Sequence, residues 1–159
     1  MTDRPRLFKY AIDYLSKFSS SKANLERILK SKIRRLKLDK KDKHILYSSV
    51  NDILTKLENN NFINDSQYSS SKIRNFIFQG KSKLFIKSYL FQKGVDTVII
   101  NDSLEEYKLE NNNWEEGAAK TFARKKNLSN EKESREKNLA KMARAGFSYE
   151  ISKKTLEDI

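Results

Sequence analysis

The residues of this chain that could do chemistry are its cations, because the side chains that most enzymes need are scarce. Lys and Arg total 33 against 21 Asp and Glu, which gives a net charge of +12. Two stretches, residues 27–38 and 66–95, each hold six bases and no acid. Clustered cations bind anions, so this pattern favours a surface for an anionic partner. For either stretch alone, an ordinary solvated basic face is the competing interpretation.

Catalytic and metal-binding groups are nearly missing from the sequence. There is no Cys, and His44 is the single His, placed among lysines at the start of an expected helix. The four Gly are too far apart for a phosphate-binding loop. Pairs of carboxylates such as Glu105 and Glu106 are adjacent in sequence and therefore point to different sides of a helix. We predict no enzymatic activity, no cofactor and no metal site.

One aromatic residue stands beside the second basic stretch. The pattern predicts a helix from about Lys83 to Lys93, on which Phe85, Ile86, Tyr89 and Leu90 form the apolar face. Lys83 and Lys87 fall away from that face, and Phe91 lies on its flank. An aromatic ring beside lysines can stack on a base or fill a pocket of a partner. Packing of Phe91 against a neighbouring element is the alternative.

The elements that position these residues are expected to be helices. Four Gly and one Pro are too few for the turns of an all-β fold. Apolar residues recur at helical spacing in three successive segments. They are Leu7, Ala11, Leu15 and Phe18; Leu25, Ile28, Leu29, Ile33 and Leu36; and Ile45, Leu46, Val50, Ile53, Leu54 and Leu57. Ser19–Ser21 and Asp39 offer N-caps, so the first 60 residues or so read as a three-helix bundle.

A repeat with an offset of 52 residues organises the rest of the chain. Leu57-Glu-Asn-Asn-Asn-Phe62 recurs as Leu109-Glu-Asn-Asn-Asn-Trp114, and Gly94 corresponds to Gly146. Each of these glycines follows a helical pattern, and Asp96 and Ser148 come two residues later as N-caps. We predict three tandem helical repeats, residues 1–63, 64–112 and 113–159. With only 37% apolar residues, thin helical layers and an elongated shape are expected.

The location of the protein is constrained only weakly. The first residues lack the apolar core of a secretory signal, and no apolar run is long enough for a transmembrane helix. The absence of Cys is compatible with the cytoplasm. We expect a cytoplasmic monomer with no membrane partner.

Three segments together resemble the RecX family of regulatory proteins. Residues 78–95, Phe-Gln-Gly-Lys-Ser-Lys-Leu-Phe-Ile-Lys-Ser-Tyr-Leu-Phe-Gln-Lys-Gly-Val, are similar to its central signature. Phe62-Ile-Asn-Asp65 with Tyr68 is similar to the start of its second repeat. Residues 142–151, Met-Ala-Arg-Ala-Gly-Phe-Ser-Tyr-Glu-Ile, are similar to its closing motif. The chain departs from the family at Ser69, where Ala is usual, and in a longer, lysine-rich link within the first repeat.

The resemblance implies a regulator, not an enzyme. Such proteins bind the RecA recombinase and its filament on single-stranded DNA, and they mainly inhibit its recombinase, ATPase and coprotease activities in homologous recombination, DNA repair and the SOS response. The implied fold is all-α, an elongated curved array of three tandem three-helix repeats with a basic concave face. The residues that we expect to bind RecA or DNA are Arg27, Arg34, Lys83, Lys87, Phe91, Lys93, Lys141 and Arg144.

Two other functions fit the same residues. Helix pairs joined by Gly-containing turns, with a basic second helix, suit a helix-turn-helix protein that binds specific DNA sequences. Against it, the units repeat in tandem and no single recognition helix stands out. A basic helical scaffold for RNA or ribosomes is the third possibility, and no distinctive feature of the sequence favours it.

Overall fold

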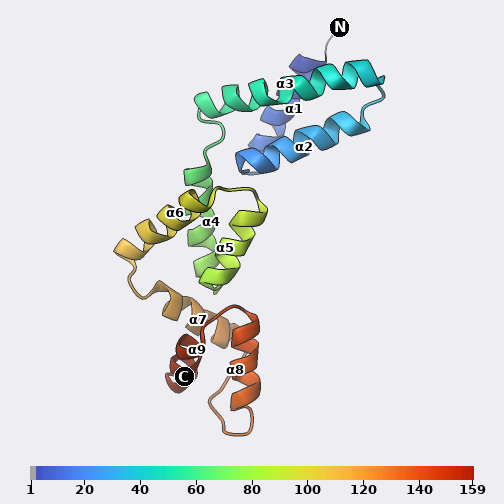
Figure 1. Ribbon diagram of the computed structural model, residues 1–159. Helices are drawn as coiled ribbons and strands as arrows, with labels where there is room; N and C mark the ends of the chain where they lie inside the picture. The colour runs from blue at the N-terminus through green and yellow to red at the C-terminus, as the bar shows by residue number, and fades with distance from the viewer. Residues whose placement is uncertain (1–2) are drawn as a thin grey trace. The chain divides into compact units, whose positions relative to one another are not determined.

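The computed structural model describes residues 3–159, and the fold is all-α, as predicted (Figure 1). The described residues form nine helices and no strand. In chain order these are α1 (Arg4–Lys17), α2 (Lys22–Arg35), α3 (Lys40–Asn59), α4 (Asp65–Phe78), α5 (Lys83–Gln92), α6 (Thr97–Glu110), α7 (Trp114–Lys125), α8 (Arg135–Arg144) and α9 (Tyr149–Glu157).

The chain divides into two compact units. The first comprises Met1–Tyr68 with Lys93–Val95, and the second comprises Ser69–Gln92 with Asp96–Ile159. The division into three repeats at residues 63 and 112 stays a prediction.

The first unit holds the expected bundle of α1, α2 and α3. Leu25, Leu29 and Ile33 of α2 are completely buried, and they pack with Leu54 and Leu57 of α3. Two residues of the predicted stripes are exposed instead of buried, which corrects the sequence interpretation. Phe18 is 56% exposed because α1 ends before it, and Ile45 is 41% exposed near the start of α3.

The second unit buries a separate set of apolar residues. Its α7 and α8 pack against α9, and α5 packs against α6. Ile86 and Leu90 of α5 are completely buried, as are Ala119 of α7, Met142 of α8 and Leu156 of α9. Helices α4 to α9 all contribute buried side chains.

Local signals place the helix ends where the sequence predicted them. The side chains of Ser21, Asp39, Asp96 and Ser148 each accept a hydrogen bond from a backbone N–H of the helix that follows. Gly146 has φ +98°, and the helix before it closes with hydrogen bonds from the N–H of Gly146 to the Ala143 carbonyl and from the N–H of Phe147 to the Met142 carbonyl. The N-caps of α6 and α9 are therefore 52 residues apart, which is the offset of the sequence repeat.

Candidate functional site

The predicted residues of α5 form a stripe along one side of the helix. Lys83 is its first residue, Lys87 follows one turn later, and Phe91 follows after another turn. The two lysines are half-buried, whereas the ring of Phe91 is 68% exposed. Ile86 and Leu90, which the core covers completely, lie on the adjoining face of the helix, since positions 83, 86, 87 and 90 follow the i, i+3, i+4, i+7 spacing. Burial of that face therefore sets the direction in which Lys83, Lys87 and Phe91 point.

A hydrogen bond between distant segments brings the end of α8 to the start of α5. The hydroxyl of Ser82 donates to the Ala145 carbonyl at 2.7 Å and accepts from the N–H of Phe85 at 3.1 Å. Ser82 is 1% exposed. The start of α5 lies beside the end of α8 (Figure 1). Since Lys83 follows Ser82 and Arg144 precedes Ala145, both predicted cations lie at this junction. Lys141 lies one turn before Arg144 on α8.

The first unit contains a junction of the same design. The hydroxyl of Ser21 donates to the Lys93 carbonyl and accepts from the N–H of Asn24 at 3.2 Å. Gly94, with φ +76°, lies so close to Ala23 that an added Cβ would overlap it. The junction places Lys93 at the start of α2, the helix that carries the exposed Arg27 and Arg34.

These positions group the eight predicted residues without placing them on one surface. The first unit holds Arg27, Arg34 and Lys93, and the second holds the other five. Within residues 3–159, five of the seven predicted cations form no ion pair: Arg34, Lys83, Lys87, Lys141 and Arg144. Their charge is therefore available to an anionic partner.

An aromatic cluster with lysines was missed by the sequence interpretation, which put Phe85 and Tyr89 on the apolar face. Phe85 is 37% exposed, and the ammonium group of Lys81 lies 4.7 Å from the centre of its ring. Lys72 lies 5.8 Å from the ring of Tyr89, and Phe76 packs edge-on against both rings. The spacing of four residues between Phe85 and Tyr89 signals a shared face, but only the tertiary structure shows that this face borders solvent.

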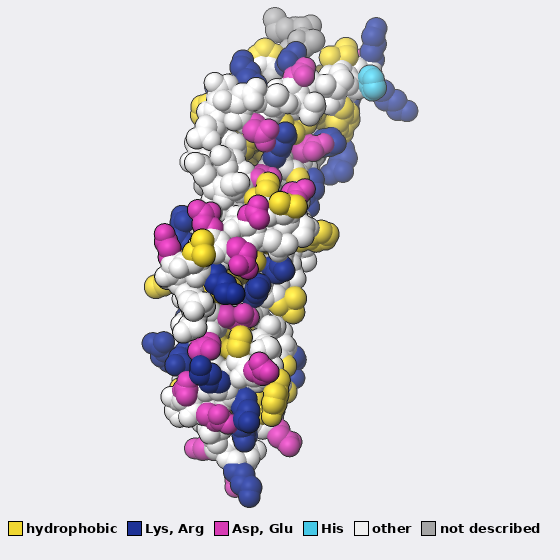
Figure 2. All heavy atoms as spheres, turned by 60° about the vertical axis from the view of Figure 1, so that its left-hand side comes forward, with side chains coloured by type: hydrophobic (Ala, Val, Ile, Leu, Met, Phe, Trp, Pro, Cys, Tyr) yellow, Lys and Arg dark blue, Asp and Glu magenta, His cyan; other side chains and the backbone are white. Residues whose placement is uncertain are grey.

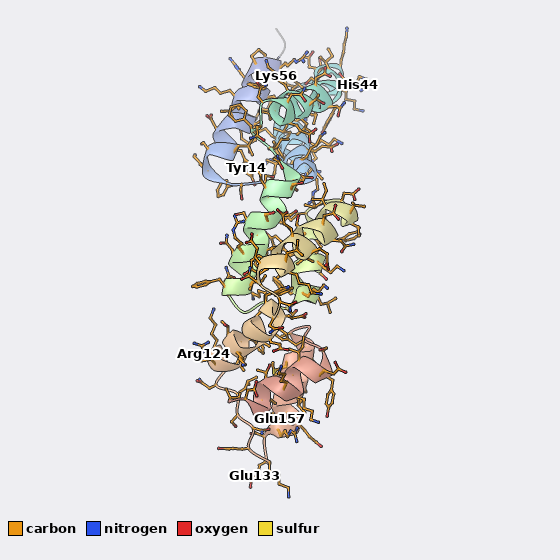
Figure 3. All side chains as sticks on the ribbon, turned by 90° about the vertical axis from the view of Figure 1, so that its left-hand side faces the viewer. Tyr14, His44, Lys56, Arg124, Glu133 and Glu157 are labelled. Carbon is orange, nitrogen blue, oxygen red and sulfur yellow. The ribbon has the colours of Figure 1, made fainter. Side chains whose placement is uncertain are left out.

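The remaining polar groups are arranged as expected for a surface. His44 is exposed on α3, away from the bundle interior (Figure 3). On the face shown in Figure 2, Lys and Arg side chains are interspersed with Asp and Glu, so charge there is mixed. Between residues 3 and 159 no three His, Asp or Glu side chains gather as metal ligands, and no helix is long and apolar enough to cross a bilayer.

Comparison with known proteins identifies the family. The chain is 30% identical over 155 residues to the regulatory protein RecX of Myxococcus xanthus (strain DK1622). The match covers 92% of this chain and 82% of that protein. The chain belongs to the RecX family. No family model matches it.

Solved RecX structures have the same fold. The crystal structure of RecX from Lactobacillus salivarius matches with a TM-score of 0.71 and 24% identity, over 98% of this chain and 96% of that one. A second crystal structure, of a regulatory protein RecX, matches with a TM-score of 0.69 and 23% identity, over 99% of this chain and 72% of that one. The predicted fold class and the family resemblance are thus confirmed.

Proposed function

We propose that this RecX-family protein binds RecA and its filament on single-stranded DNA and restrains the filament's recombinase, ATPase and coprotease activities without catalysing a reaction itself. The family membership supports a regulatory role. In this proposal the protein is a cytoplasmic monomer that acts in DNA repair, recombination and the SOS response, and residues 1–63, 64–112 and 113–159 are its repeats.

The observation that carries the proposal is the set of unpaired cations around α5. Lys83 and Lys87 form no ion pair within the described part of the chain, and Phe91 beside them exposes 68% of its surface. Cations without partners bind phosphates or acidic side chains, and an exposed ring adds stacking or burial. Lys141 and Arg144 extend this surface through the Ser82 junction. In the first unit, Arg27, Arg34 and Lys93 are proposed to contribute to binding.

The test is a titration of RecA ATPase activity on single-stranded DNA with the wild-type protein and with a Lys83→Glu/Lys87→Glu variant. Wild-type protein should inhibit the ATPase. The double reversal should raise the concentration needed for half inhibition at least about tenfold at moderate salt, because it replaces two attractive charges with two repulsive ones. Circular dichroism should remain unchanged.

A charge-matched control distinguishes an effect of this surface from an effect of the protein's net charge. Lys137 of α8 and Lys153 of α9 are exposed and form no ion pair within residues 3–159. The variant Lys137→Glu/Lys153→Glu has the same net charge as the α5 variant and should inhibit like the wild type. Full inhibition by the α5 variant would refute the assignment of this surface, and no inhibition by the wild type would refute the proposed function.

The titration also distinguishes two modes of binding. Inhibition at concentrations far below that of RecA would indicate that the protein blocks filament ends. Inhibition that requires stoichiometric amounts would indicate that it coats the filament.

A further inference from the structure

The second unit contains an open groove that none of the predicted binding residues lines. Its volume is about 870 Å³, and its walls come from the second half of α4, the end of α6, the Asn111–Asn113 turn and α7. This volume lies within the ~300–1,000 Å³ that binding pockets commonly span. The groove is therefore large enough for several side chains of a partner.

The groove is basic. Arg74, Arg124 and Lys125 line it, and no Asp or Glu does. Arg74 and Arg124 form no ion pair within residues 3–159, and Lys125 donates a hydrogen bond to the Gln79 carbonyl at 3.1 Å. Figure 3 shows Arg124 near the end of α7. The two guanidinium groups are available to carboxylates, which they bind with geometrically matched, charge-assisted hydrogen bonds.

The floor and one wall of the groove are apolar. Trp114 and Ile77 are each 9% exposed, and the ring of Tyr107 lies edge-on to Trp114 at 6.3 Å between centroids. Phe78 exposes 85% of its surface at the end of α4. An added Cβ at Gly117 on α7 would meet nothing within 4 Å, so an occupant can approach the helix backbone closely there. Apolar side chains of a partner would thus replace water on Phe78 and on the surface of α7.

Amide side chains supply the remaining polar groups. Asn112 and Asn113 are exposed, and their side chains make no hydrogen bond within the described residues. An amide both donates and accepts hydrogen bonds, which suits the alternating N–H and C=O groups of a peptide backbone. Nucleic acid fits less well, because the Trp114 ring is nearly buried and Phe78 is the single strongly exposed ring among the residues that line the groove.

We propose that this groove binds a short acidic segment of a protein partner, with one or more apolar side chains of the segment on Phe78 and α7 and its carboxylates on Arg74 and Arg124. This inference goes beyond the proposed function and involves none of the residues assigned to it.

Trp114 makes the test direct, because it is the single tryptophan of the chain. The probe is a synthetic, fluorescein-labelled peptide of alternating glutamate pairs and single Phe or Leu residues, without Trp or Tyr. Anisotropy of the label measures affinity, and the emission of Trp114 in titrations with unlabelled peptide reports occupancy of the groove. The peptide should bind, shift the Trp114 emission and weaken as salt is added. A peptide with Lys in place of Glu should do none of these.

Two independent variants test the location. Arg74→Gln/Arg124→Gln removes both guanidinium groups, and Gly117→Phe fills the groove from a helix position with open space around it. Each should raise the dissociation constant at least about tenfold. The control Lys137→Gln/Lys153→Gln, which has the same loss of charge outside the groove, should bind the peptide like the wild type.

Three results would overturn the inference. The first is that the acidic peptide does not bind, and the second is that neither groove variant weakens its binding. The third is that a thymidine oligonucleotide shifts the Trp114 emission more than the peptide does, and at a lower concentration. The last result would assign the groove to nucleic acid. No RecA or DNA filament is present in the peptide titration, so its failure leaves the proposed function to its own test.

Discussion

The junction between α5 and α8 leads to a quantitative prediction for Ser82→Ala. The substitution removes the hydroxyl that caps α5 through the N–H of Phe85 and that donates to the Ala145 carbonyl at 2.7 Å. Loss of an N-cap costs about 1 kcal/mol. The Ala145 carbonyl also loses its donor in a partly buried position, which costs about 1 kcal/mol more. The variant should therefore lose about 2 kcal/mol of unfolding free energy.

Ser148→Ala is the matched control. The hydroxyl of Ser148 caps α9 by accepting from the N–H of Ile151 at 3.2 Å, and this hydroxyl makes no second hydrogen bond within residues 3–159. Its loss should cost about 1 kcal/mol. Urea unfolding followed by Trp114 fluorescence measures both variants, since Trp114 belongs to the same unit as both serines.

A double-mutant cycle isolates the contact between the two segments. A Cβ added at Gly146 would overlap the Ser82 hydroxyl, and its φ of +98° strains any other residue. Gly146→Ala should therefore cost about 1–2 kcal/mol for the backbone and more for the overlap. Because Ser82→Ala removes the overlapping atom, the double variant should lose less than the sum of the two single losses. Equal losses for Ser82→Ala and Ser148→Ala, with additive effects in the cycle, would refute this reasoning.

Three further outcomes are expected. Gly94→Ala should lower the urea midpoint of the first unit, because the added Cβ would overlap Ala23. Circular dichroism during urea unfolding measures this midpoint, and an unchanged value would contradict the close packing of Gly94 against Ala23. Phe91→Ala should change the unfolding free energy by less than about 0.5 kcal/mol, because the ring is 68% exposed. The same variant should inhibit the RecA ATPase more weakly than the wild type, and equal inhibition would show that Phe91 is not part of the binding surface. The hydrogen bond to Glu116, and then its charge, raise the pKa of Lys154 above its usual 10.5, so the stabilisation by this pair is present at neutral pH and is lost as the pH rises through the folded-state pKa. Urea midpoints of wild type and Lys154→Gln should accordingly converge at alkaline pH, and a constant difference would contradict the ion pair.

Several local features of the fold are readable in the sequence. Leu25, Leu29 and Ile33 predict the buried side of α2 by their spacing alone, because helical periodicity relates residues within two turns of each other. Asp96 and Ser148 predict the starts of α6 and α9, since an N-cap bond joins residues two or three apart. The sequence does not predict whether a side chain is exposed when that depends on a segment far away along the chain. The spacing of Phe85 and Tyr89 indicates a shared face but not that this face borders solvent beside Lys81.

The family resemblance rests on short motifs, and the structure gives one of their glycines a physical role. Gly146 belongs to the closing motif that resembles RecX, and a Cβ added to it would overlap the Ser82 hydroxyl. The sequence identified it as a helix end from its place after a helical pattern. Its second role, close packing against the start of α5, depends on a residue more than 60 positions away.

By itself the sequence determined the helices, their caps, the scarcity of catalytic groups and the segments in which cations cluster. These follow from composition and from interactions between residues that are neighbours along the chain. Only the tertiary structure decided that the hydroxyls of Ser21 and Ser82 bind carbonyls 72 and 63 residues away, and that Arg74 and Arg124 line one groove. The reason is that no periodicity or cap encodes which distant segments meet. Which distant segments come into contact is determined when whole helix faces are buried against one another.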